Sequence, residues 1–314
     1  MIFTPEILTL MLINIIFAIF AFIAFLLSIK IVRNWDSDAN TKLQYQLEKQ
    51  NFLNATLIKY IFWLKIPLFL FFVFTIDKLS DIITGAMCAA AIVDATPYGI
   101  YLFIIKILTL YLFGMWLILH YKDIKEERPR FIKTKYILFI TIFPLFILEI
   151  ILEILMFTEL DTSKILSCCG TLYSNATGSY IQNLFVVPTP LLLGVFYGNF
   201  LLLTLFYFLK NRYFYALTGG VFVIVALMSL ILFFGTYIYE LPTHHCPFCF
   251  LQKEYFYIGY LIYSLLFLGT FYAIVAGILT DKINIKISFI FILFYVIVVS
   301  LYPSLFYLRN GVWL

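Results

Sequence analysis

Charged residues are scarce in this sequence. Asp, Glu, Lys and Arg make up 12% of its 314 residues, while 64% of the residues are hydrophobic and 20% are aromatic. A water-soluble domain typically has about 25% charged residues, so the composition excludes that class. The sequence also lacks a phosphate-binding loop, a nucleophile elbow, a zinc-protease helix and internal repeats. The enzyme and repeat classes that depend on these motifs are therefore not indicated.

Histidine is rare as well. The chain has three His residues and no Cys-x-x-Cys-His segment. We therefore expect neither a two-haem b-type core nor covalently attached haem. His120 falls at the end of an apolar run and is interpreted as a solvated helix terminus.

Long apolar runs dominate the chain instead. Eight segments each supply about 20 or more mainly apolar residues, enough to cross the roughly 30 Å hydrocarbon core of a lipid bilayer as an α-helix. The segments lie near residues 8–30, 56–77, 97–120, 136–157, 185–208, 214–236, 255–279 and 287–308. The predicted fold is an all-α, polytopic integral membrane helical bundle, a single membrane domain over residues 1–314.

The basic residues predict how this bundle is oriented. Fifteen of the 21 Lys and Arg residues fall in or beside the odd-numbered connections between spans, and short loops rich in Lys and Arg stay cytoplasmic. Both termini are therefore expected on the outer face. We expect the membrane to be a bacterial inner membrane and this face to be its periplasmic side. This topology accounts for the formal net charge of +4, so no nucleic-acid partner is required. The polar stretch 34–54 is predicted to be a short cytoplasmic helix and turn.

With this orientation every cysteine lies on the outer side. The cysteines are Cys88, Cys168, Cys169, Cys246 and Cys249. An oxidising compartment favours disulfides, thiol–disulfide exchange or metal binding for such thiols. The run of small residues around Cys88 also allows a simpler role as an apolar core residue.

The segment HHCPFC, residues 244–249, holds the densest set of reactive side chains. It falls where the sixth span ends and the seventh begins. Two thiols in a Cys-x-x-Cys motif either close a small disulfide loop or hold one soft metal ion. Both uses are open on the sequence alone.

The longer segment CPFCFLQK resembles the quinone-linked thiol oxidases of the DsbB type. In that family a Cys-x-x-Cys opens an outer-face helix, and a basic residue follows at the quinone site. Cys246 and Cys249 match the redox pair, and Lys253 matches the basic position. The resemblance covers this segment only. The order of the cysteines, with loop thiols before the Cys-x-x-Cys, is closer to the vitamin K epoxide reductase type, which runs the same relay.

The resemblance implies a relay of electrons and a quinone cofactor. A soluble periplasmic thiol protein would pass electrons through Cys88 or through Cys168 and Cys169 to the Cys-x-x-Cys pair, and a membrane quinone would take them up. Tyr257 and Tyr260 are then candidates to line the quinone pocket. The same tyrosines also fit an aromatic belt at the membrane interface.

The chemistry expected of the pair follows from its position. A Cys-x-x-Cys at a helix start is exposed to the positive end of the helix dipole, which favours the thiolate. Lys253 and a protonated His245 would act in the same direction. We therefore expect one of the two thiols to be a good nucleophile.

The competing interpretation uses the same segment as metal ligands. His244, His245, Cys246 and Cys249 offer two imidazoles and two thiols, a soft donor set suited to copper or zinc. Because there is no second Cys-x-x-Cys, further ligands have to come from distant loops. The chain would then be an outer-face metal-binding protein, either a transporter or an accessory subunit of a respiratory complex.

Ionisable residues inside the spans are a separate functional signal, because each costs several kcal/mol unless it is paired or hydrated. Lys106 and Glu149 each lie about 12 Å from the outer end of their span, so they are predicted to pair. Glu153 lies one turn nearer the outside and extends a carboxylate stripe that can pass protons, unless the pair only fixes helix contacts. Lys65 lies deeper, where the sequence suggests no partner, and it either snorkels or lines a cavity.

Overall fold

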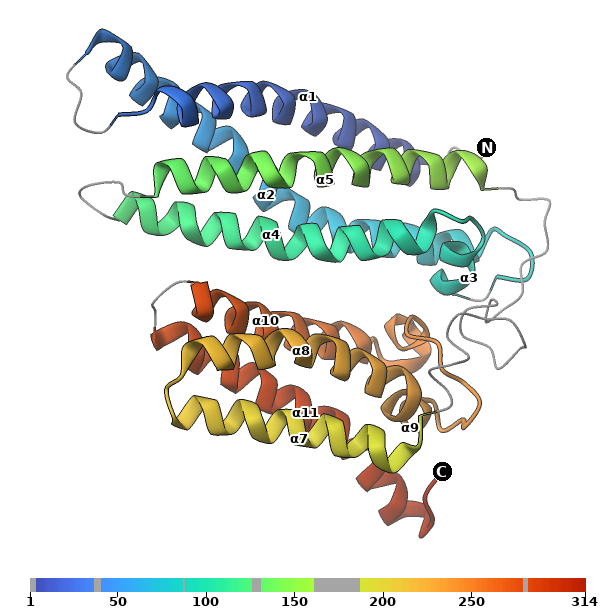
Figure 1. The fold of residues 1–314 in the computed structure, drawn as a ribbon. Coiled ribbons are helices and arrows are strands. Elements are labelled where there is room, and N and C mark those ends of the chain that lie inside the picture. The colour runs from blue at the N-terminus through green and yellow to red at the C-terminus, as the bar shows by residue number, and fades with distance from the viewer. Residues whose placement is uncertain (1–3, 37–40, 87, 126–130, 161–186, 279–281) are drawn as a thin grey trace. The chain divides into compact units, whose positions relative to one another are not determined.

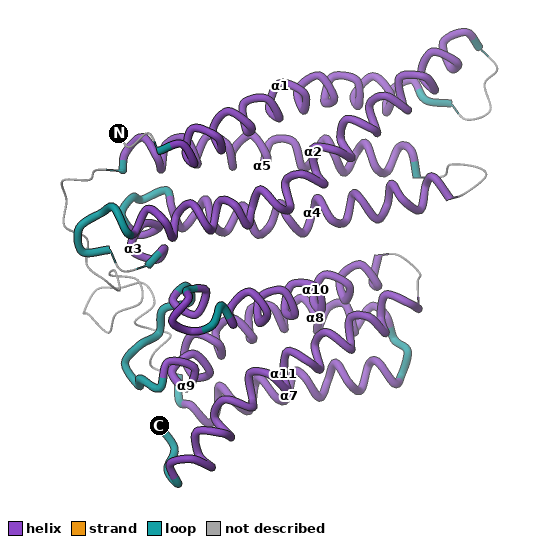
Figure 2. Tube along the Cα trace, turned by 180° about the vertical axis from the view of Figure 1, so that it is seen from behind, coloured by secondary structure: helices purple, strands orange, loops and turns teal. Residues whose placement is uncertain are grey.

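The computed structural model describes residues 4–36, 41–86, 88–125, 131–160, 187–278 and 282–314. These residues form helices and loops, with no strand among them (Figures 1 and 2). Within the described ranges eight helices are long and apolar enough to cross a membrane, which confirms the prediction of an all-α, polytopic chain. The chain divides into two compact units, Met1–Leu166 and Ser167–Leu314. The expectation of a single membrane domain stays a prediction.

Four long helices and one short helix build the first unit. They are α1 (Pro5–Asn34), α2 (Lys42–Ser80), α3 (Ala89–Asp94), α4 (Gly99–Lys125) and α5 (Ile132–Glu159). α1 and α4 each pack on both α2 and α5, so the long helices close into a bundle (Figure 1). Its interior is aromatic. The Phe62 ring stacks on Phe113 with 4.3 Å between centroids and meets Trp116 edge-on at 5.4 Å. Such packing holds helices together in lipid, where the hydrophobic effect does not drive their association.

In its described part, the second unit has four candidate spans and a structured loop. Its elements are α7 (Thr189–Phe208), α8 (Arg212–Ser229), the π-helix η1 (Leu230–Phe234), α9 (Gly235–Tyr239), the 3-10 turns η2 (Cys249–Leu251) and η3 (Lys253–Tyr255), α10 (Ile258–Ile278) and α11 (Lys282–Asn310). α8, η1 and α9 form one span, Arg212–Tyr239. Small residues let α8 and α10 approach closely. A Cβ atom added to Gly219 would lie 2.5 Å from the Cβ atom of Ala273.

The polar stretch 34–54 differs from the prediction. α2 begins at Lys42, where the Thr41 side chain caps it by accepting the N–H of Gln44 at 3.2 Å, and it continues unbroken for 39 residues. The chain from Thr41 to Pro67 contains neither glycine nor another proline, so nothing interrupts the helix. The expected short helix is wrong, since residues 42–54 are the polar start of a span helix. The expected turn includes residues 37–40, which lie outside the described residues.

His120 also differs from the prediction of a solvated terminus. It is 7% exposed, and its ring stacks on Trp116 with 5.0 Å between centroids. α4 continues past it to Lys125, and Lys135 of α5 forms a buried ion pair with Asp123. This end of α4 is therefore packed against α5.

Candidate functional site

The loop between α9 and α10 carries both cysteines of the Cys-x-x-Cys motif. We call it the thiol loop (residues 240–257). It leaves α9 through Glu240 at φ 54° and reaches α10 through Phe256 and Tyr257 at φ 54° and 56°. These three residues adopt the left-handed conformation, which is costly for residues other than glycine. Surrounding contacts must therefore hold the loop in this shape.

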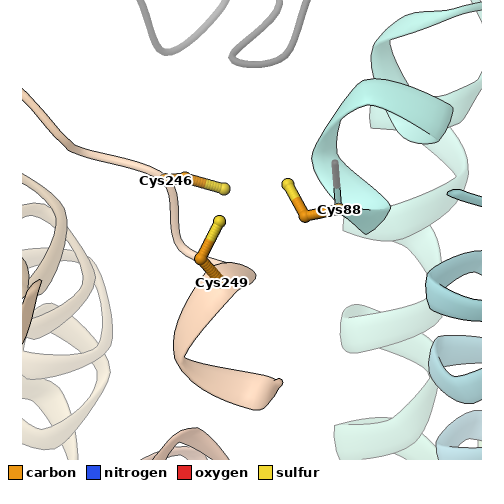
Figure 3. A group of neighbouring side chains, drawn as sticks. All are labelled: Cys88, Cys246 and Cys249. Carbon is orange, nitrogen blue, oxygen red and sulfur yellow. The ribbon is translucent and has the colours of Figure 1, made fainter. Parts of the chain in front are cut away.

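The two sulfur atoms of the motif lie close together. The Sγ atoms of Cys246 and Cys249 are within 4.8 Å of one another, and the two residues are 1% and 7% exposed. Figure 3 shows Cys246 on the extended part of the loop and Cys249 at the start of η2. The N–H of Phe248 donates to Cys246 Sγ at 3.4 Å, which stabilises negative charge on sulfur. This proximity suits either disulfide formation or chelation of one soft ion.

Two tyrosines anchor the turn that carries the sulfurs. Tyr239, the last residue of α9, donates its hydroxyl proton to the carbonyl of Cys246 and accepts the N–H of Phe250 at 3.2 Å. Tyr263 on α10 donates to the carbonyl of Pro247 at 2.6 Å. Because these contacts fix backbone atoms, the spans on both sides of the loop determine where the sulfurs lie.

His245 joins the thiol loop to the π-helix. Its Nδ1 atom lies 3.1 Å from the carbonyl oxygen of Ile231 in η1. A carbonyl only accepts, so Nδ1 carries a proton. Burial lowers the pKa of His245 from its ordinary value, and the hydrogen bond to Ile231 opposes this effect. Burial thus disfavours the protonated form of His245, on which its expected influence on the thiols depends.

The expectation that the motif opens a span helix is also wrong. α10 begins at Ile258, after both 3-10 turns and the left-handed residues Phe256 and Tyr257. Cys249 opens a turn of only three residues, which is too short to build up a macrodipole. The thiols therefore do not lie on the first turn of α10.

The predicted quinone and metal ligands lie around the thiol loop. Lys253 is exposed on η3, Tyr257 is 54% exposed, and the Tyr260 ring lies 6.3 Å from the Tyr257 ring. The His244 ring packs edge-on against Tyr239 at 4.4 Å. In the described part of the second unit, no third Cys, His, Asp or Glu donor lies within 4.8 Å of both sulfurs. This unit thus supplies two of the four ligands of a closed zinc site.

The other cysteines are candidates for the shuttle thiol. Cys88, also labelled in Figure 3, belongs to the first unit, where it is buried and precedes the first residue of α3. Cys168 and Cys169 lie outside the described residues. Their part in a relay stays a prediction.

The predicted pairing of Lys106 with Glu149 is confirmed and belongs to a larger network. Lys106 Nζ on α4 lies 3.0 Å from Glu149 Oε1 and 2.7 Å from Glu153 Oε2, both on α5. Lys65 Nζ on α2 lies 2.9 Å from the same Glu149 oxygen and 2.8 Å from Asn14 Oδ1 on α1. Asn14 Nδ2 donates to Glu153 Oε1 at 2.9 Å. These five side chains, the ionic cluster, close a ring across the four long helices of the first unit, and each residue is 6% exposed or less.

Aromatic rings and a hydroxyl complete the surroundings of the ionic cluster. The Lys65 ammonium lies 4.8 Å from the centroid of the Phe146 ring, and the Lys106 ammonium lies 4.4 Å from that of Phe72. Both distances suit a cation–π contact. The Thr109 hydroxyl donates to Glu149 Oε2 at 2.8 Å. Each ammonium thus has two hydrogen bonds to the cluster and one aromatic face.

Sequence reasoning missed Lys65 and Asn14 as members of the cluster, and Thr109 as a hydrogen-bond donor to it. A signal for Asn14 exists, since it is the one amide side chain within residues 8–30. Strongly polar residues inside spans face the bundle interior and find partners there. The depth of Lys65 in its span did not indicate its pairing with Glu149. The contact also depends on how each helix is rotated about its own axis.

No family model matches this chain, and no curated protein and no solved structure is significantly similar to it. The likeness of residues 246–253 to quinone-linked thiol oxidases therefore rests on the motif itself.

Proposed function

We propose that the chain is a membrane thiol–disulfide oxidoreductase that passes electrons between periplasmic thiols and a membrane quinone. The observation that carries this proposal is the proximity of the Cys246 and Cys249 sulfurs, within 4.8 Å, in a turn anchored by Tyr239 and Tyr263. A pair held this way can cycle between dithiol and disulfide with little rearrangement of the loop.

The proposed reaction has two halves. A thiolate of the periplasmic partner attacks the Cys246–Cys249 disulfide, and a mixed disulfide forms. The partner's second thiolate resolves it, so the partner leaves oxidised and the pair stays reduced. The reduced pair then gives two electrons and two protons to the quinone, which becomes a quinol, while the S–S bond forms again. In a relay through Cys88, Cys168 or Cys169, that shuttle thiolate first attacks the Cys246–Cys249 disulfide. The partner's first thiolate then attacks the shuttle sulfur, and its second thiolate frees the shuttle thiol.

Lys253, Tyr257 and Tyr260 are proposed to receive the quinone. Lys253 is exposed on the turn that follows the cysteines, and Tyr257, four residues later, is more than half exposed. An ammonium stabilises the charge that develops on a quinone oxygen as it is reduced. The proposal places the thiol loop on the periplasmic side of a bacterial inner membrane, following the distribution of Lys and Arg.

Metal binding is the second candidate, since two sulfurs this close can also chelate copper or zinc. The chain would then be part of a transporter or an accessory subunit of a respiratory complex. This function needs ligands beyond the two sulfurs. The redox proposal needs only the pair itself.

The experiment starts from purified, reduced protein mixed with a soluble ubiquinone or menaquinone analogue. We expect two thiols to be lost for each quinone reduced, and Cys246→Ser or Cys249→Ser to abolish the loss. Lys253→Met should slow quinone reduction while the pair still reacts with diamide, because this change leaves the sulfurs intact. Lys286→Met, another exposed lysine, is the matched control and should have no effect.

Two outcomes would overturn the proposal. One is a thiol count that does not change with quinone although diamide oxidises the same protein. The other is stoichiometric copper or zinc that survives chelation, together with no quinone-dependent loss of thiols. The second outcome would assign the thiol loop to metal binding.

A further inference from the structure

The ionic cluster lies in the first unit and takes no part in the thiol chemistry proposed for the second. It buries two lysines and two glutamates inside a bundle of membrane-spanning helices. Well-packed apolar residues often stabilise a protein as much as a buried ion pair does, or more, so packing alone does not require four charges. Ionisable residues within spans commonly mark ion or proton sites.

The two carboxylates of the cluster are not equally compensated. Glu149 accepts hydrogen bonds from two ammonium groups, Lys65 and Lys106, and from the Thr109 hydroxyl. Glu153 accepts from Lys106, which it shares with Glu149, and from the neutral amide of Asn14. Glu149 thus has two cationic donors, whereas Glu153 has one, which it shares.

A small cavity adjoins the cluster. It has a volume of about 10 Å³ for the centre of a water molecule, and its polar lining comes from Lys65, Lys106, Thr109 and Glu149. The rest of the lining is apolar. A water molecule needs roughly this volume and two to four polar partners, so the cavity is the size of one water beside the shared lysine.

We propose that the ionic cluster is a proton-binding site within the membrane, with Glu153 as the group that takes up the proton. Lys106 Nζ gives a proton to Glu153 Oε2 across 2.7 Å. The N–H bond breaks at Lys106 and an O–H bond forms at Glu153. A hydronium at the cavity then returns a proton to Lys106 and leaves as water, without any transfer of electrons.

The net charge of the cluster rises from zero to +1 in this step. The ionisable groups that face Glu153 are Lys106 from α4, Glu149 from its own helix and Lys65 from α2, while α1 contributes the neutral Asn14. After protonation Glu149 keeps both lysines as partners. The added charge is therefore spread over two ammonium groups and one carboxylate.

The full-length protein in detergent provides the test. Dicyclohexylcarbodiimide enters apolar regions and adds to a protonated carboxyl group but not to a carboxylate. We expect the label on Glu153, and we expect it to fall about tenfold for each pH unit above the midpoint, as for binding of one proton. Glu149, Glu153 and Glu159 share the tryptic peptide 136–164, so fragmentation of this peptide in a mass spectrometer shows which of the three carries the label. A water-soluble carbodiimide should label Glu159, which is exposed, and this confirms recovery of the peptide.

A substitution at Asn14 sharpens the test. Asn14→Leu removes the amide donor to Glu153 Oε1, so labelling of Glu153 at a fixed pH should rise by about tenfold. Asn54→Leu is the matched control, because Asn54 is also a buried amide in this unit but donates to Ser28 at 3.0 Å. It should leave the labelling unchanged.

Two results would overturn the proposal. The first is no label on Glu153 at any pH at which far-UV circular dichroism shows the helices intact, while Glu159 reacts with the water-soluble reagent. The second is a label on Glu149 in place of Glu153. Both measurements use the unmodified chain, so a variant that fails to fold does not prevent the decision.

Discussion

Removing Lys106 should destabilise the first unit strongly. Lys106→Met takes away the cation that two carboxylates share. Lys65 remains to compensate Glu149, whereas Glu153 is left with the neutral Asn14. Removal of one partner from a buried pair costs about 3–5 kcal/mol, because the remaining charge loses its counter-ion. We expect a loss of this size in the free energy of unfolding.

A second substitution should restore part of that loss, and the structure indicates which one. Glu153→Gln in the Lys106→Met background removes the uncompensated charge. The double variant should recover about 1–3 kcal/mol relative to additive behaviour. Glu149→Gln should recover less, because it takes away the carboxylate partner of Lys65 and leaves Glu153 charged.

Unfolding in mixed detergent micelles, followed by far-UV circular dichroism, measures these free energies. Lys78→Met is the control, since Lys78 is 52% exposed in its ion pair and exposed pairs contribute little. Strictly additive losses for Lys106→Met and Glu153→Gln would refute the reasoning, because they would mean that the two side chains do not interact.

Four further outcomes follow from the described contacts. Tyr239→Phe should cost about 1–3 kcal/mol and speed alkylation of the loop thiols, because the hydroxyl binds the backbone of the turn. Gly259→Ala should destabilise the thiol loop by about 1–3 kcal/mol, since its Cβ would lie 2.9 Å from a loop carbonyl, while Gly198→Ala, with nothing within 4 Å, should be tolerated. The pKa of His245 is lowered in the folded protein, so its contribution to the free energy of unfolding is complete above the unfolded pKa of about 6.5. This contribution is lost as the pH falls from that value toward the folded pKa. A His245→Asn variant whose free energy of unfolding has the same dependence on pH would contradict this. A membrane-impermeant thiol reagent added to intact, reduced cells should label Cys168, Cys169 or Cys246, and labelling only after the membrane is broken would contradict the predicted topology.

The hydropathy of the sequence was enough to predict the spans. The depth of Lys106 and Glu149 within their spans was enough to predict that these two residues pair. Lys106 and Glu149 lie at similar distances from the outer ends of their helices, and the structure brings them together at 3.0 Å. Depth could not assign Lys65 to the same carboxylate, because the contact also depends on how α2 is rotated about its axis. Rotation is determined by packing between helices, which a single hydropathy profile does not contain.

The backbone geometry of the thiol loop could not be predicted from the sequence, for a different reason. The prediction let the helix begin at the Cys-x-x-Cys motif, since nothing in CPFCFLQKEYFY marks a break. The structure ends the loop with Phe256 and Tyr257 in the left-handed conformation, which aromatic residues rarely adopt. Tertiary contacts such as those of Tyr239 and Tyr263 stabilise this backbone, and local sequence does not reveal them.

The most direct test of the central proposal is the oxidation state of one peptide. Trypsin should release residues 213–253, which contain Cys246, Cys249 and no other cysteine. After the reduced protein is mixed with a quinone analogue and unreacted thiols are alkylated, mass spectrometry should find this peptide unalkylated and lighter by two hydrogens, and dithiothreitol should reverse the change. Equal alkylation of both cysteines with and without quinone would contradict the proposal.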